Sequence, residues 1–174
     1  MRDSTPLYLL ATGSRSDIEG GRWQFILRRT DGRVEIAESD FERALLGDRV
    51  ALLAVVRGLE ALPEPSQVLL LTPSRYILNG FRHGLCTWED QGWQQRRLGR
   101  RMAVRNHDLW ARVAQARQFH QVTVRYSESS LNDAARIQNW AEPGSLAEDL
   151  QLTLAEAQQH FDPVAPPSPL AHCA

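Results

Sequence analysis

The stretch Asp48–Leu62, DRVALLAVVRGLEAL, and the run Val68–Leu71, VLLL, decide the fold class. The first stretch carries a broad apolar stripe at helical spacing, which predicts a helix packed on a sheet. Pro63 and Pro65 end that helix. The second stretch is a short, continuous apolar run bounded by prolines, which is typical of a buried strand. A helix followed by a buried strand indicates an α/β domain.

Upstream of this helix, the sequence predicts three strands. Leu7–Ala11 is a short apolar run, and Arg22–Arg29 alternates with its large apolar side chains on one face. Thr30–Gly32 supplies a turn, after which Val34 and Ile36 alternate again. Two alternating segments around such a turn predict a β-hairpin.

Downstream of the buried strand, helices predominate. In order, we expect a short helix capped by Ser74 and ending near Gly80–Gly84, a helix over Trp88–Gln95, a basic loop over Arg96–Arg105, a helix over Asn106–Arg117, and a strand over Val122–Tyr126. Ser130 and Asp133 resemble a capping box that opens a helix reaching Trp140. The fold is therefore predicted to be a mixed five-stranded sheet flanked by helices.

The C-terminal region is predicted to lie outside this domain. Residues 145–160 favour one more helix, with Leu146, Leu150 and Leu154 on one stripe. Residues 162–174 contain four prolines and are predicted to be disordered.

Composition limits the possible classes of function. The chain has 174 residues, enough for one domain with a hydrophobic core, and no apolar run approaches the ~18 residues of a membrane span. No signal peptide is expected after Met1. With only two cysteines, we expect a reducing cytoplasm. All 20 basic residues are arginine, so lysine-based chemistry is excluded and any phosphate contact must come from arginine.

Several short strings occur in the order and spacing of one enzyme family. They are Ala11–Ser14, Gly20–Gly21 with Trp23, Arg49–Leu52 with Leu59–Leu62, Thr72–Tyr76, Trp88 with Gly92–Trp93, and Asn106–Trp110. Together they resemble the bacterial-type ribonuclease H family over about residues 7–141. The resemblance implies a ribonuclease H-like fold and cleavage of RNA in RNA–DNA hybrids with two ions, Mg²⁺ or Mn²⁺.

The carboxylates that this chemistry requires are missing at the matching positions. The family's first aspartate falls at Thr12, its helix glutamate at Ala51 and its second aspartate at Pro73. Its last aspartate falls at Gln138 without gaps, or at Arg136 with a short gap. None of these residues is a carboxylate ligand for a hard divalent ion. We therefore expect no metal, no cofactor and no catalysis.

Other acids near these positions offer a rebuilt metal site as an alternative. Asp48 lies three residues before Ala51, and Asp17 follows the first strand. Glu128 falls at the family's flexible-loop histidine, and Asp133 lies about one turn before Arg136. For Asp48 and Asp133, capping and the helix dipole are sufficient explanations.

The basic residues indicate where nucleic acid would bind. They are Arg96, Arg97, Arg100, Arg101 and Arg105, at the place of the family's basic protrusion, and Arg75, beside the lost second aspartate. Phosphate binding and a solvated loop with local salt bridges are both compatible with this pattern. Glu89, Asp90 and Asp108 flank the cluster and are available for such bridges.

Three hypotheses about function follow. The first is an inactive ribonuclease H-like protein that binds an RNA–DNA hybrid or duplex weakly. The second is a structural or protein-interaction domain, with Leu146, Leu150 and Leu154 as the surface for a partner protein or a homodimer. The third is an active hybrid-cleaving ribonuclease with a rebuilt metal site.

Overall fold

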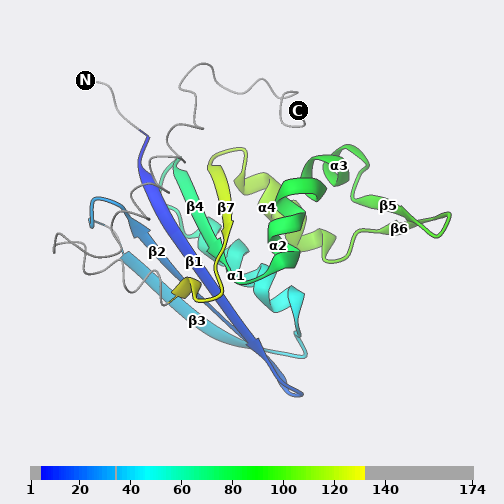
Figure 1. Ribbon diagram of the computed structural model, residues 1–174, viewed down its shortest axis with the longest axis horizontal. Helices are drawn as coiled ribbons and strands as arrows, with labels where there is room; N and C mark the ends of the chain where they lie inside the picture. Colours follow the sequence, from blue (N-terminus) through cyan, green and yellow to red (C-terminus); the bar gives the residue numbers. More distant parts are fainter. Residues whose placement is uncertain (1–4, 34, 132–174) are drawn as a thin grey trace.

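The computed structural model describes residues 5–33 and 35–131, which form a curved sheet with helices packed against it (Figure 1). The sheet has five strands in the order β3-β2-β1-β4-β7. The strands are β1 (Leu7–Ser16), β2 (Gly20–Arg29), β3 (Glu35–Arg43), β4 (Gln67–Thr72) and β7 (Gln121–Tyr126). β1, β2 and β3 pair antiparallel, whereas β4 runs parallel to both β1 and β7. The predicted mixed five-stranded sheet and the predicted hairpin are confirmed.

The centre of β1 is buried on both faces of the sheet. Tyr8 and Leu10 point into the large core beneath the helices, whereas Leu9 and Ala11 pack with apolar residues of β4 on the opposite face. Burial on both faces explains why this strand is a continuous apolar run.

Helix α1 (Asp48–Glu60) packs across β1 and β2, as its apolar stripe predicts. Val50, Leu52 and Leu59 are buried in the main core, where a Leu→Ala change typically costs about 2–5 kcal/mol. α4 (His107–Ala116) packs beside α1 and completes this layer.

The helical segment after β4 is longer than the sequence predicts. α2 (Arg75–Asn79) continues through the π-helical turn η1 (Gly80–Gly84) into α3 (Leu85–Asp90). The prediction that the helix ends near Gly80–Gly84 was therefore wrong. A Cβ at Gly80 would come within 2.3 Å of the Trp110 ring, and one at Gly84 within 2.4 Å of the Trp88 ring. The two glycines allow the indole rings to pack against this helical segment.

The segment after α3 also differs from its prediction. The predicted helix over Trp88–Gln95 ends at Asp90, and the predicted basic loop contains a two-stranded hairpin, β5 (Gln94–Arg97) with β6 (Arg100–Ala103). Gly92 and Trp93 both have positive φ and turn the chain out of the helix. We call β5, β6 and their connecting turn, residues 94–103, the arginine ribbon. It projects from the body of the molecule (Figure 1).

Several predictions concern residues that lie outside the described part of the chain. These are Asp133 of the predicted capping box, Arg136, Gln138, the helix over 145–160 with Leu146, Leu150 and Leu154, and the tail over 162–174. Ser130 is described, and its hydroxyl donates a hydrogen bond to the carbonyl of Thr12. No helix in the described ranges is long and apolar enough to span a bilayer.

Candidate functional site

Thr12, which the sequence predicts to stand at the family's first aspartate position, is enclosed by the protein. It lies in β1 and is 1% exposed. Its hydroxyl donates to the carbonyl oxygen of Leu71 in β4 at 3.3 Å, and its own carbonyl accepts from the Ser130 hydroxyl. The side chain therefore joins two parallel strands, and its hydroxyl proton is already used within the fold.

Pro73, predicted to stand at the second aspartate position, is exposed and directly follows β4. The residues on either side of it complete a local hydrogen-bonded turn. The Thr72 hydroxyl oxygen accepts from the backbone N–H of Ser74 at 3.2 Å, and the Ser74 hydroxyl oxygen accepts from the N–H of Ile77 at 3.3 Å, which caps α2. We call Thr12, Thr72, Pro73, Ser74 and Ser130 the sheet-end cluster.

The side chains at these positions do not fit a divalent cation. Ala51 is half-buried on α1 and packs against the main core, and neither its methyl group nor the Pro73 ring offers a ligand atom. Mg²⁺ needs oxygen ligands, usually carboxylates and water. Within residues 5–33 and 35–131, no three His, Cys, Asp or Glu side chains gather as metal ligands would.

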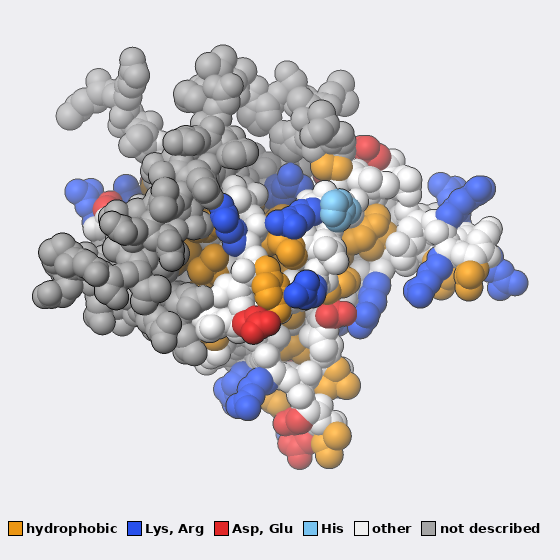
Figure 2. All heavy atoms as spheres, viewed as in Figure 1, with side chains coloured by type: hydrophobic (Ala, Val, Ile, Leu, Met, Phe, Trp, Pro, Cys, Tyr) orange, Lys and Arg blue, Asp and Glu red, His pale blue; other side chains and the backbone are white. Residues whose placement is uncertain are grey.

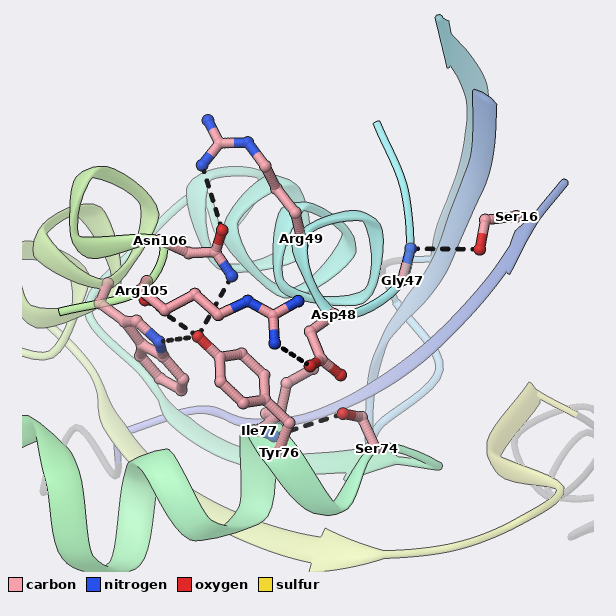
Figure 3. A network of polar contacts seen from close by, with 10 residues as sticks. Ser16, Gly47, Asp48, Arg49, Ser74, Tyr76, Ile77, Arg105 and Asn106 are labelled. Carbon is pink, nitrogen blue, oxygen red and sulfur yellow. Dashed lines mark hydrogen bonds and ion pairs between the residues drawn. The ribbon is translucent and has the colours of Figure 1, made fainter. Parts of the chain in front are cut away.

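Three of the four acids that could rebuild a metal site lie in the described part of the chain, and each has another partner there. Figure 3 shows Asp48, at the start of α1, facing Arg105, whose guanidinium lies 3.1 Å from the carboxylate. Asp17 accepts from the backbone N–H groups of Glu19 and Gly20 in the β1–β2 turn. Glu128 accepts from the Tyr126 hydroxyl at 3.4 Å.

A polar network connects α1, α2 and α4 beside the sheet-end cluster (Figure 3). Arg49 of α1 forms a bidentate ion pair with Asp108 of α4, at 2.8 and 2.6 Å. This hydrogen bonding lowers the pKa of Asp108 to about 2. The Tyr76 hydroxyl accepts from the Trp110 indole at 2.8 Å and from the Asn106 amide at 3.2 Å, and it donates to the Arg105 carbonyl. The network fixes the start of α4, where the chain returns from the arginine ribbon.

The arginine ribbon carries four exposed arginines in two cross-strand pairs. Arg97 lies opposite Arg100, and Arg96 lies opposite Arg101. Cross-strand partners share a face of a ribbon and neighbours along a strand alternate, so each face carries one arginine pair. Figure 2 shows basic side chains on both sides of the projecting ribbon. Within the described part of the chain, none of the four guanidinium groups forms an ion pair.

One face of the ribbon borders a hollow on the surface. The hollow measures about 590 Å³, within the ~300–1,000 Å³ of typical ligand pockets. It is lined by Thr87, Trp88, Gln91, Gln94, Gln95, Arg96 and Arg101. Its polar and cationic lining suits an anionic, hydrogen-bonding ligand such as a nucleotide backbone.

The other two predicted binding arginines lie in different surroundings. Arg75 is exposed, and its guanidinium lies 4.8 Å from the centre of the Tyr126 ring. Arg105 stacks over the Tyr76 ring at 5.9 Å while it pairs with Asp48. The predicted set therefore separates into four ribbon arginines without an ion pair among the described residues, one arginine stacked on a tyrosine, and one paired with a carboxylate. The glutamines of the hollow were missed because no sequence pattern marks them.

Comparisons with known proteins identify the family and agree with the fold. The RNase H family model matches residues 10–131. A ribonuclease H of Rhodopirellula baltica is 34% identical over 119 residues, which cover 68% of this chain and 75% of that protein. This chain belongs to the RNase H family. A ribonuclease H of Methylococcus capsulatus is 37% identical over 103 residues, covering 59% of this chain and 63% of that one.

Solved RNase H structures share the fold. A type 1 RNase H with the type 2 active-site motif superimposes with a TM-score of 0.59 at 24% identity, covering 74% of this chain and 66% of that one. A foamy viral protease-reverse transcriptase, solved in complex with an RNA/DNA hybrid, gives a TM-score of 0.60 at 12% identity. The match covers 75% of this chain and 18% of the viral protein. At these identities the structures establish the RNase H fold alone.

Proposed function

We propose that this chain is a catalytically inactive member of the RNase H family that binds the phosphate backbone of nucleic acid through the arginine ribbon. The observation that carries the proposal is a contrast in side-chain chemistry. The positions that would hold metal ions lack carboxylates, whereas the ribbon presents four arginines without ion-pair partners in the described chain.

The inactive state follows from the requirements of two-metal hydrolysis. In that reaction the ions stabilise both the attacking and the leaving oxygen, and carboxylates hold the ions in place. Thr12 uses its hydroxyl proton on Leu71, and Ala51 and Pro73 have no ligand atom. Asp48, the nearest substitute, is paired with Arg105. This pairing argues against the rebuilt metal site.

Binding is supported by the positions of the charges. Lone surface arginines cost little in water, but four arginines on one short projecting ribbon create a strongly positive region. Phosphate contacts by such groups release counterions and account for most non-specific affinity. The foamy viral protein that shares the fold was solved with an RNA/DNA hybrid and with double-stranded DNA, so we choose both duplexes as probes.

The protein-interaction alternative predicts that the arginines are neutralised within the chain. In that case they would pair with Glu89, Asp90 and Asp108. Asp108 instead pairs with Arg49, and neither Glu89 nor Asp90 pairs with a ribbon arginine. The homodimer or partner surface at Leu146, Leu150 and Leu154 stays a prediction, as does the cytoplasmic location.

A hydrolysis assay tests the first half of the proposal. Purified protein, prepared from a host lacking its own RNase H enzymes, is incubated with a labelled RNA–DNA hybrid in Mg²⁺ or Mn²⁺. We expect no cleavage above buffer. Turnover that a chelator abolishes, and that Asp48→Asn or Asp133→Asn also abolishes, would show that a rebuilt site is active.

A binding titration tests the second half. Fluorescently labelled hybrid, DNA duplex and single strands are titrated at several salt concentrations. Three or four phosphate contacts predict a log–log salt slope of roughly -3, with weak, micromolar affinity at physiological salt. A flat titration against all three probes at low ionic strength would instead favour the protein-interaction domain.

A further inference from the structure

The tip of the arginine ribbon is a leucine in an unusual conformation. Leu98 and Gly99 form the two-residue turn between β5 and β6, with φ values of 50° and 77°. A turn with positive φ at both central residues favours Asn-Gly, because most side chains are strained in that region. Leu98 is also 97% exposed, so it gains no burial within the described protein.

The flanking strands add a second local cost. Two of the four cross-strand pairs of the ribbon place two arginines directly opposite one another, and like charges in that arrangement repel. A strained, exposed leucine and two repelling pairs thus occur together on one short hairpin. Features that lower local stability in this way are characteristic of binding sites, where a ligand offsets them.

The arrangement matches a nucleic-acid groove. A two-stranded ribbon fits within a groove of a duplex, where a phosphate backbone runs along each side. With one arginine pair on each face, both backbones can be contacted at once, and the tip then points to the bases. Apolar side chains delivered in this way, leucine included, insert at base steps and partly unstack them.

We propose that Leu98 is an apolar wedge that inserts at a base step of a bound duplex while the two arginine pairs contact the flanking phosphates. This inference rests on the proposed nucleic-acid binding and adds its mode. A lipid bilayer fits the ribbon less well, because one arginine pair would face away from a membrane on which the ribbon lay. The ribbon also contains no Trp, Tyr or Phe, the residues that anchor proteins at membrane interfaces.

The test separates the effect of the Leu98 side chain on binding from the effect of the turn conformation. Leu98→Asn introduces the residue that this turn prefers, so its melting temperature should equal or exceed that of the parent. Leu98→Phe keeps an apolar side chain at the same backbone position. Leu46→Asn removes another exposed leucine, 50% exposed and distant in sequence, as the matched control.

Two readouts are measured on a hybrid and on a DNA duplex that carry 2-aminopurine, whose fluorescence rises when the base unstacks. We expect the parent, Leu98→Phe and Leu46→Asn to raise the fluorescence at saturation. Leu98→Asn should bind about tenfold more weakly, as expected for one lost apolar contact, with an unchanged salt slope and no fluorescence rise.

The outcomes distinguish this inference from the function on which it rests. If Leu98→Asn binds and unstacks like the parent, the wedge is wrong and backbone binding stands. If the parent binds none of the probes, backbone binding fails, and the wedge fails with it. Sedimentation of the parent, but not of Leu98→Asn, with phosphatidylserine vesicles in the absence of any nucleic-acid binding would overturn the wedge in favour of a membrane contact.

Discussion

The sheet-end cluster and the arginine ribbon differ in whether their polar side chains have partners within the described chain. At the sheet end, the hydroxyls of Thr12, Thr72 and Ser74 each have a partner inside the chain. On the ribbon, four guanidinium groups point outward without ion-pair partners among the described residues. The first region is therefore internally satisfied, whereas the second has guanidinium groups that no carboxylate of the described residues neutralises.

The energetic reason is the difference in burial. Clustered carboxylates at a buried sheet end repel one another and are poorly solvated, so they are tolerated only with the ions that they hold. If the chain is inactive, as we propose, hydroxyls and apolar groups at these positions avoid that cost. Exposed arginines carry little comparable penalty, because water solvates them. A chain can therefore lose its metal ligands and keep its basic ribbon.

The largest expected effect comes from the ribbon. Replacing Arg96, Arg97, Arg100 and Arg101 with alanine should weaken duplex binding by about a thousandfold at 0.1 M salt, which is the electrostatic contribution of a slope of roughly -3. The melting temperature should stay constant or rise, because two repelling pairs are removed. Fluorescence anisotropy and thermal unfolding measure the two quantities.

A control variant removes the same charge elsewhere. Arg15, Arg22, Arg33 and Arg43 are exposed on the five-stranded sheet and its turns. Their replacement with alanine should weaken binding far less than the ribbon variant does. Equal losses from both variants would mean that net charge alone governs binding, and the ribbon would lose its special role.

The next largest effect is at the sheet end. Thr12→Asp places a carboxylate in a buried position opposite the Leu71 carbonyl, without a proton to donate when it is ionised. We expect the free energy of unfolding to fall by about 2–4 kcal/mol at neutral pH. Burial should raise the pKa of the new carboxyl, so the loss should grow as pH rises through that pKa and shrink in acid.

Chemical denaturation at several pH values measures this loss, with Thr12→Val as the control for losing the hydroxyl alone. Adding Mn²⁺ should not restore the stability of Thr12→Asp. Specific rescue by Mn²⁺, absent with Thr12→Val, would mean that the sheet end still accepts a metal ion and that the contrast between the two regions is overstated.

A smaller effect concerns Asp108, which lies at the start of α4 between the two regions. Its pKa is lowered to about 2 by Arg49, so the pair adds stability above the ordinary carboxyl pKa and loses it as pH falls from about 4 to 2. The side chains are 38% and 51% exposed, so solvent screens the pair.

Asp108→Asn should therefore cost no more than about 1 kcal/mol at neutral pH and nothing near pH 2. Urea unfolding as a function of pH measures the difference between variant and parent. Glu60→Gln, which breaks the Arg112 pair between the same two helices, serves as the control for the contact of α1 with α4. A constant difference down to pH 2 would show that the asparagine perturbs packing rather than charge.

Much of the fold could be predicted because burial leaves a periodic pattern. The apolar side chains of α1 and of β2 face the core, so they recur at helical spacing in α1 and at every second residue in β2. Both patterns are visible in the sequence. The continuation of the helical segment through Gly80 could not be predicted, because glycine there serves a contact with Trp110 far along the chain. The two strands of the arginine ribbon could not be predicted for a different reason. Its strands bury neither face, so no alternation marks them, and Leu98 replaces the usual turn residue.

The candidate site was partly predictable for the same reason. The non-ligating residues at Thr12, Ala51 and Pro73 can be read from local strings, and so can the presence of the basic cluster. Which arginines are available cannot be read in this way, because it depends on contacts such as that between Arg105 and Asp48, 57 positions apart. Arg97 and Arg105, eight positions apart, therefore differ in whether a carboxylate of the described chain compensates their charge.

The smallest predicted effect is the difference in salt dependence between removing Arg97 and removing Arg105. Arg97 lies on the ribbon without an ion-pair partner in the described chain, whereas Arg105 is paired with Asp48 and stacked on Tyr76. Removing an arginine that neutralises one phosphate lowers the magnitude of the salt slope by about 0.9. Arg97→Ala should produce that change, and Arg105→Ala should produce less than half of it, since its charge is already compensated. Asp48→Asn frees Arg105 and should raise affinity slightly while making the slope steeper. Equal slope changes for Arg97→Ala and Arg105→Ala would mean that the Asp48 pair opens when nucleic acid binds, and that the interface extends from the ribbon to the start of α1.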